Sequence, residues 1–92
     1  MYSKRDIEKA ILEAVKAVAG IEFLEKSANL VDRDMNIIPA NFLYVFDMLE
    51  EKFRLPVYNI FIDSTYEVMT VENLTEALFE LQKQNLEEKS PN

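Results

Sequence analysis

The first twenty residues carry the clearest pattern of apolar and polar positions in the chain. Apolar residues recur there at helical spacing, at Ile7, Ala10, Ile11, Ala14, Val15 and Val18. Ser3 and Asp6 have the spacing of a capping box at a helix N-terminus. Gly20 is typical of a helix C-terminus, because glycine adopts the left-handed backbone conformation without strain. The pattern therefore predicts a helix over residues 4–19.

A second helical pattern begins at Pro39, a residue that suits the first turn of a helix. The residues after it place one set of apolar side chains on a shared face: Phe42, Val45, Phe46, Leu49 and Phe53. We expect this helix to span residues 39–53, because Pro56 prevents a longer one.

A third helical pattern follows Thr70, which is a suitable N-cap. Its apolar face consists of Val71, Leu74, Ala77, Leu78 and Leu81. This pattern predicts a last helix over residues 71–86, followed by a disordered polar tail at 87–92.

The segments between these helices lack a regular period. Residues 20–38 mix isolated apolar side chains with turn-forming Asn and Asp, so we expect a long loop that packs onto the core. Residues 55–69 contain a short apolar run from Val57 to Ile62, which fits either a strand-like segment or a buried helical turn. Because the chain offers no second strand candidate, we expect one short helix or two turns here. The chain as a whole is predicted to be one all-α domain over residues 1–86. It is a small bundle of three main helices with a short or irregular third element and a long first loop.

Composition makes most enzyme classes unlikely. The 92 residues contain no cysteine, no histidine and a single glycine, so we expect no enzyme and no cofactor site. Asp32, Asp34 and Asn36 imitate the start of a calcium-binding loop, but Ile37 and Leu43 occupy the sixth and twelfth places, where such loops need Gly and Glu. We therefore expect no metal site.

Charge narrows the class of partner. The net charge is −7, and residues 1–29 are balanced with five acids and five bases, whereas residues 30–80 carry ten acids and three bases. Nucleic acid and anionic membranes are poor partners for such a chain, and a basic protein surface is a suitable one. The chain has no apolar segment of the length of a membrane span and no signal-peptide pattern at Met1, so we expect a cytoplasmic protein.

The polar face of the second predicted helix is the candidate partner-binding site. It carries two large amphipathic or apolar residues among three acids: Tyr44, Asp47, Met48, Glu50 and Glu51. Amphipathic anchors among charges suit an interface, although a purely solvated helix face is the alternative for such a pattern.

The second helix also resembles that of the acyl carrier protein family. In that family a modified serine is followed by apolar residues at four, six, seven and ten places, an acidic pair, and an aromatic residue. With Pro39 in the place of the serine, this pattern is matched by Leu43, Val45, Phe46, Leu49, Glu50, Glu51 and Phe53. The likeness extends over residues 4–82 and includes Leu55-Pro56 and Thr70-Val71. It implies a small helical bundle whose second helix binds basic patches on enzymes.

The same resemblance implies that the carrier function has been lost. The family attaches 4′-phosphopantetheine to a serine hydroxyl, and here Ile38-Pro39-Ala40 replaces Asp-Ser-Leu. The chain is similar in its size and its eroded serine motif to a group of carrier relatives in bacterial peptide-maturation systems. We therefore expect a non-catalytic adaptor that docks a biosynthetic enzyme without phosphopantetheine.

Two alternatives remain open from the sequence. One is a true carrier modified at Ser64, which follows Asp63 but lacks most of the expected apolar spacing. The other is an unrelated helical domain that self-associates through Tyr58 and Phe61.

Overall fold

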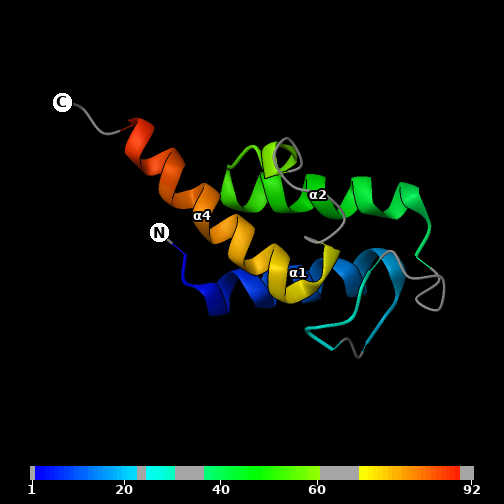
Figure 1. Cartoon of the computed structure of the whole chain (residues 1–92). Coiled ribbons are helices and arrows are strands. Elements are labelled where there is room, and N and C mark those ends of the chain that lie inside the picture. The colour runs from blue at the N-terminus through cyan, green and yellow to red at the C-terminus, as the bar shows by residue number, and fades with distance from the viewer. Residues whose placement is uncertain (1, 23–24, 31–36, 61–68, 90–92) are drawn as a thin grey trace.

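The computed structural model describes residues 2–22, 25–30, 37–60 and 69–89. The regular structure of these residues consists of α1 (Lys4–Ala19), α2 (Pro39–Phe53), the 3-10 helix η2 (Val57–Asn59) and α4 (Val71–Lys89) (Figure 1). Within these ranges there is no strand, only an isolated bridge between Asn29 and Thr70. The predicted all-α bundle is therefore confirmed.

Local capping sets the ends of α1 where the sequence predicts them. The Ser3 hydroxyl accepts a hydrogen bond from the Asp6 backbone N–H at 3.1 Å, and the Asp6 carboxylate accepts one from the Ser3 N–H at 3.4 Å. At the other end Gly20 has a φ of 74°, and its N–H bonds to the Lys16 carbonyl at 2.9 Å. These contacts satisfy backbone groups that a helix end leaves unpaired.

The bounds of α2 also agree with the prediction. The helix begins at Pro39 without a side-chain cap from Ile38. It ends at Phe53, and the next residue, Arg54, takes the left-handed conformation with a φ of 55° and donates its N–H to the Glu50 carbonyl at 2.8 Å.

The prediction for the end of α4 is wrong by three residues. Thr70 caps the helix as expected, because its hydroxyl accepts the Asn73 N–H at 3.0 Å. The helix then continues to Lys89, past the expected end at Leu86 and into the predicted tail. Glu and Lys are favourable helix formers, and the sequence contains no helix breaker before Pro91.

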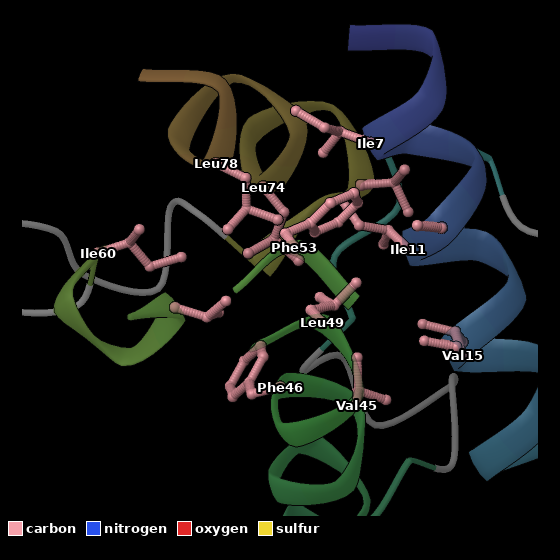
Figure 2. Close-up of a cluster of buried hydrophobic side chains, with 14 of the residues drawn as sticks. Ile7, Ile11, Val15, Val45, Phe46, Leu49, Phe53, Ile60, Leu74 and Leu78 are labelled. Atoms are coloured by element: carbon pink, nitrogen blue, oxygen red, sulfur yellow. The ribbon is translucent and has the colours of Figure 1, made fainter. Parts of the chain in front are cut away.

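The core is shared by all three α-helices, and α1 packs against both α2 and α4. Figure 2 shows Ile7 and Ile11 of α1 converging with Leu49 and Phe53 of α2 and Leu74 of α4. Nearly all residues of the predicted apolar faces are buried, and the others are partly buried against this core: Val18, Phe42, Ala77 and Leu81.

The first loop is tied to the start of α4. Leu30 is buried, and its N–H donates to the Met69 carbonyl at 2.8 Å. The Glu72 N–H donates to the Lys26 carbonyl at 2.9 Å. Ile21 and Ile37 are partly buried against the core, as expected for this loop. Ile38, the last residue of the loop, is 59% exposed and does not pack onto the core. The other large apolar residues of the loop lie outside the described residues: Phe23, Leu24, Val31 and Met35.

The short apolar run after α2 begins with the 3-10 helix η2, which agrees with the prediction of a short helix in this segment. Val57 in η2 is fully buried, and Leu55 and Ile60 on either side of η2 are buried as well. Among the helices of the described residues, none is both long and apolar enough to cross a lipid bilayer.

Candidate functional site

All five candidate partner-binding residues lie on α2, on the part of the helix that points away from the core. Val45, Leu49 and Phe53 bury the opposite side of the helix. Tyr44 is 63% exposed and Met48 is 42% exposed. Asp47 and Glu51 are exposed and Glu50 is half-buried. We refer to this set as the α2 surface: Tyr44, Asp47, Met48, Glu50 and Glu51.

One edge of the α2 surface is held by Tyr58 of η2. The Tyr58 hydroxyl lies 3.1 Å from Asp47 Oδ1 and 3.3 Å from the Leu43 carbonyl, and it donates toward both. The Tyr58 backbone N–H donates to Glu50 Oε1 at 3.4 Å. Two of the three carboxylates are therefore oriented by one residue of the neighbouring element.

The surroundings of Tyr58 keep its phenol protonated. Its ring packs edge-on against Phe46, with centroids 5.6 Å apart. Partial burial raises the pKa of Tyr58 above its usual value, and the hydrogen bond to Asp47 and the negative charges of Asp47 and Glu50 raise it further. The hydroxyl thus remains a donor to Asp47 well above neutral pH.

The opposite edge of the α2 surface borders a groove between α1 and α2. Met48 and Glu51 line this groove together with Ala10, Glu13 and Ala14 of α1, and its volume is about 290 Å³. Small alanine side chains at the floor leave room beside Met48. A second hollow shares Ala10, Glu13 and Lys52 with this groove and is also lined by Tyr2, Asp6 and Lys9.

The structure therefore divides the predicted site into two edges with Tyr44 between them. Asp47 and Glu50 face η2, while Met48 and Glu51 face α1. Exposed carboxylates attract Lys and Arg side chains, and Tyr44 and Met48 offer apolar contact area. The arrangement suits binding to a basic surface that also presents an apolar contact.

Tyr58 is the residue of the candidate site that sequence reasoning did not place there. The sequence marked it only as a possible self-association residue, and the structure shows its hydroxyl engaged within the molecule. No local pattern could have indicated the contact, because Tyr58 and Asp47 belong to different elements separated by a turn.

The other sequence candidates can be placed only in part. Pro39, which the resemblance aligns with the carrier serine, is the first residue of α2. Ser64, Phe61, Asp32 and Asp34 lie outside the described residues. Within the ranges that the structure describes, no three side chains of the kind that bind metals are grouped together.

Comparison with known proteins identifies no relative of this chain. No protein-family model, curated protein or solved structure matches it significantly. The likeness to acyl carrier proteins therefore depends on the residues of the second helix and its flanks.

Proposed function

We propose that this protein is a divergent acyl-carrier-related adaptor. It docks a basic surface of a partner enzyme through the α2 surface, and it does not carry phosphopantetheine. The observation that carries this proposal is the exposure of Tyr44 and Met48 among acidic residues on a helix that begins with Pro39.

Charge and exposure together support docking by α2. The acids of the α2 surface lie in the part of the sequence that holds essentially all the net negative charge. Complementary charges mainly speed the encounter and orient the partners, whereas buried anchors supply affinity. Tyr44 is the natural anchor, because it combines a large ring with a polar tip and is 63% exposed.

The start of α2 supports the loss of the carrier function. The resemblance places the modified serine at Pro39, and proline has no side-chain hydroxyl for a phosphodiester. Its neighbour Ile38 is exposed and apolar, so it replaces the family's acid with no equivalent charge. The finer setting, a peptide-maturation or other biosynthetic system, follows from the resemblance in size and in the eroded serine motif.

Intact-mass analysis tests the absence of a carrier group. The protein is incubated with coenzyme A and a promiscuous phosphopantetheinyl transferase, beside a working carrier protein as a positive control. We expect no mass increase. An adduct that disappears in Ser64→Ala would instead make the protein a working carrier.

Capture of the partner tests docking. The wild-type chain, Glu51→Lys and Glu80→Lys are immobilised and exposed to an extract of the native cells. Glu80 is exposed on α4, so its reversal changes the net charge equally at another place. We expect a protein that binds the wild type and Glu80→Lys, is lost with Glu51→Lys and is released by salt. Equal capture by all three chains would reject α2 as the docking surface.

A further inference from the structure

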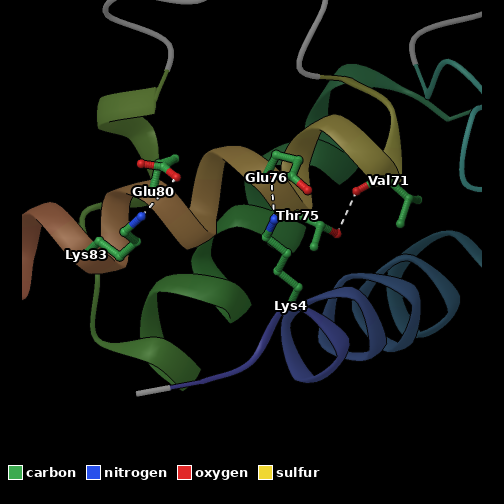
Figure 3. A network of polar contacts seen from close by, with 6 residues as sticks. All are labelled: Lys4, Val71, Thr75, Glu76, Glu80 and Lys83. Atoms are coloured by element: carbon green, nitrogen blue, oxygen red, sulfur yellow. Dashed lines mark hydrogen bonds and ion pairs between the residues drawn. The ribbon is translucent and has the colours of Figure 1, made fainter.

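The outer side of α1 carries exposed cations that make no ion pair among the described residues. Arg5, Lys9 and Lys16 are exposed and share one side of the helix. We call them the α1 basic stripe. Three other lysines are paired: Lys4 with Glu76 at 3.0 Å and Lys83 with Glu80 at 3.5 Å (Figure 3), and Lys26 with Glu8 at 3.3 Å. Lys52 of α2 is exposed and, among the described residues, also makes no ion pair. An unpaired basic stripe is unexpected in a chain with a net charge of −7.

The spacing of the stripe is that of a single helical ridge. Lys9 lies four residues after Arg5, Leu12 three residues after Lys9, and Lys16 four residues after Leu12. Steps of three and four residues keep side chains on one face of a helix. Leu12 is partly buried against the core and supplies an apolar position within the ridge.

The exposed ridge of α2 has the same spacing in the opposite chain direction. From Glu51 backwards, Asp47 lies four residues away, Tyr44 three further and Ala40 four further. All of these side chains are exposed. Glu51 and Asp47 thus occupy the places that match Arg5 and Lys9, and Tyr44 corresponds to Leu12. The place that matches Lys16 is taken by Ala40, so the register contains two ion pairs.

We propose that α1 of one copy of this protein packs antiparallel against α2 of a second copy. This register places Arg5 opposite Glu51, Lys9 opposite Asp47 and Leu12 against Tyr44. When no other partner is bound, the α1 basic stripe of a neighbouring copy covers the α2 surface.

The contact is intermolecular and head-to-tail. Within one molecule α1 and α2 pack through their buried sides, and Glu51 borders the groove between them while Lys9 lines the neighbouring hollow. Among the described residues no ion pair joins the two ridges. Each copy then offers one basic and one acidic ridge to different neighbours. Such a contact extends into short open chains, unless two copies exchange both ridges and close as a symmetric dimer.

The net negative charge limits this association without preventing it. At physiological ionic strength charges are screened beyond about 8 Å, so the groups in direct contact outweigh distant like charges. Exposed ion pairs contribute little each, and we expect weak association that appears at high protein concentration. The inference does not rest on the carrier resemblance or on an outside partner. It adds that self-association covers the surface that a partner would need.

Sedimentation velocity of the whole chain over a concentration series tests the proposal. We compare the wild type with Arg5→Glu, Glu51→Lys and the double exchange of both residues. Lys83→Glu and Glu80→Lys serve as controls, because they change net charge equally on α4. Circular dichroism verifies that every variant is folded.

The wild type should sediment faster with increasing concentration, and this increase should disappear at about 1 M salt, where the screening length is about 3 Å. Each single reversal should weaken association about ten-fold, since it replaces attraction by repulsion at one pair. The double exchange, and an equimolar mixture of the two single variants, should restore it. A wild type that stays monomeric, or a double exchange that fails to restore association, would overturn the proposal.

The same variants separate this inference from the proposed function. Arg5→Glu should weaken self-association about ten-fold and leave partner capture intact, because it does not alter α2. Loss of capture with Glu51→Lys alone would support docking even if the chain proves monomeric.

Discussion

Two single side chains connect parts of this protein that are remote in sequence. Gln82 of α4 is 5% exposed, and its amide pairs with the Tyr2 backbone by accepting the N–H at 2.6 Å and donating to the carbonyl at 2.8 Å. Tyr58 binds Asp47 and Leu43 of α2 in a comparable way. These contacts hold the chain start on α4 and η2 on α2.

Replacing Gln82 by Met tests the first connection. Met keeps the size of the side chain but leaves the Tyr2 N–H and carbonyl without their partner. We expect a loss of about 1 kcal/mol in the free energy of unfolding, the usual range for a partly buried hydrogen bond. Urea denaturation measures it. Gln84→Met, at an exposed position of the same helix, should change stability by less than about 0.5 kcal/mol; equal losses would contradict the pairing.

Replacing Tyr58 by Phe tests the second connection through its pH dependence. The pKa of Tyr58 is raised in the folded state by burial and by Asp47 and Glu50. A raised pKa means that the unfolded chain releases this proton first, so stability falls as pH increases from the ordinary tyrosine value of about 10 through the folded value.

Phenolate absorbance should show a component that titrates above the ordinary tyrosine value, and this component should be missing in Tyr58→Phe. The alkaline loss of stability should be smaller in the variant. A wild-type titration without a late component would show that Asp47 does not hold the phenol.

At the scale of elements, the helices are defined by their own ends. α1 and α2 both terminate in a left-handed residue, Gly20 and Arg54 respectively. Glycine takes this conformation without strain, whereas a residue with a Cβ does so at a cost. A Cβ added to Gly20 would meet nothing within 4 Å, so only the backbone conformation opposes a substitution there.

Substitution of Gly20 by Ala therefore isolates the conformational cost of this helix end. We expect a loss of about 1 kcal/mol in the free energy of unfolding. Gly20→Asn should lose less, because Asn tolerates the left-handed region better than Ala. Thermal or urea unfolding measures the free energy of unfolding of the two variants. Similar losses of stability in both would mean that the end of α1 is not held in the left-handed conformation in solution.

At the scale of the whole molecule, one core joins α1, α2 and α4. Leu78 of α4 is fully buried in this core, whereas Leu86, two turns later, is 48% exposed. The helix thus contributes to the bundle through its first half, and its second half extends past most of the core.

Two substitutions in α4 test whether the first half of the helix contributes more to the stability of the core than the second half. Leu78→Ala should cost about 2–5 kcal/mol, because it leaves a cavity among packed side chains. Leu86→Ala should cost less than about 0.5 kcal/mol. Chemical denaturation followed by circular dichroism compares them. A comparable loss from Leu86→Ala would show that the end of α4 is covered in solution, by a partner or another copy.

The whole molecule also carries two surfaces of opposite charge. The α1 basic stripe and the acidic ridge of α2 point outward from neighbouring helices, because burial of Ile11 and Leu49 turns each helix's charged side to solvent. The order of charges in the sequence and the fold together produce two complementary surfaces on one small domain.

Much of the fold follows from the sequence because its signals are local. Helical spacing and caps such as Ser3 and Thr70 predicted α1, α2 and the start of α4, and each acts within a few residues. The end of α4 was placed too early because no strong stop signal occurs there, and ordinary helix propensity carries the helix to Lys89. The exposure of Tyr44 and Met48 also follows from helical spacing.

The sequence by itself thus determined the helices, their buried faces and the acidic character of α2, since each depends on residues three or four apart. Only the tertiary structure decided that Tyr58 binds Asp47, that Gln82 pairs with Tyr2, and that the loop at Leu30 joins the start of α4. The same holds for the groove beside Met48. These features depend on how segments distant in sequence pack together, and no local pattern encodes that geometry.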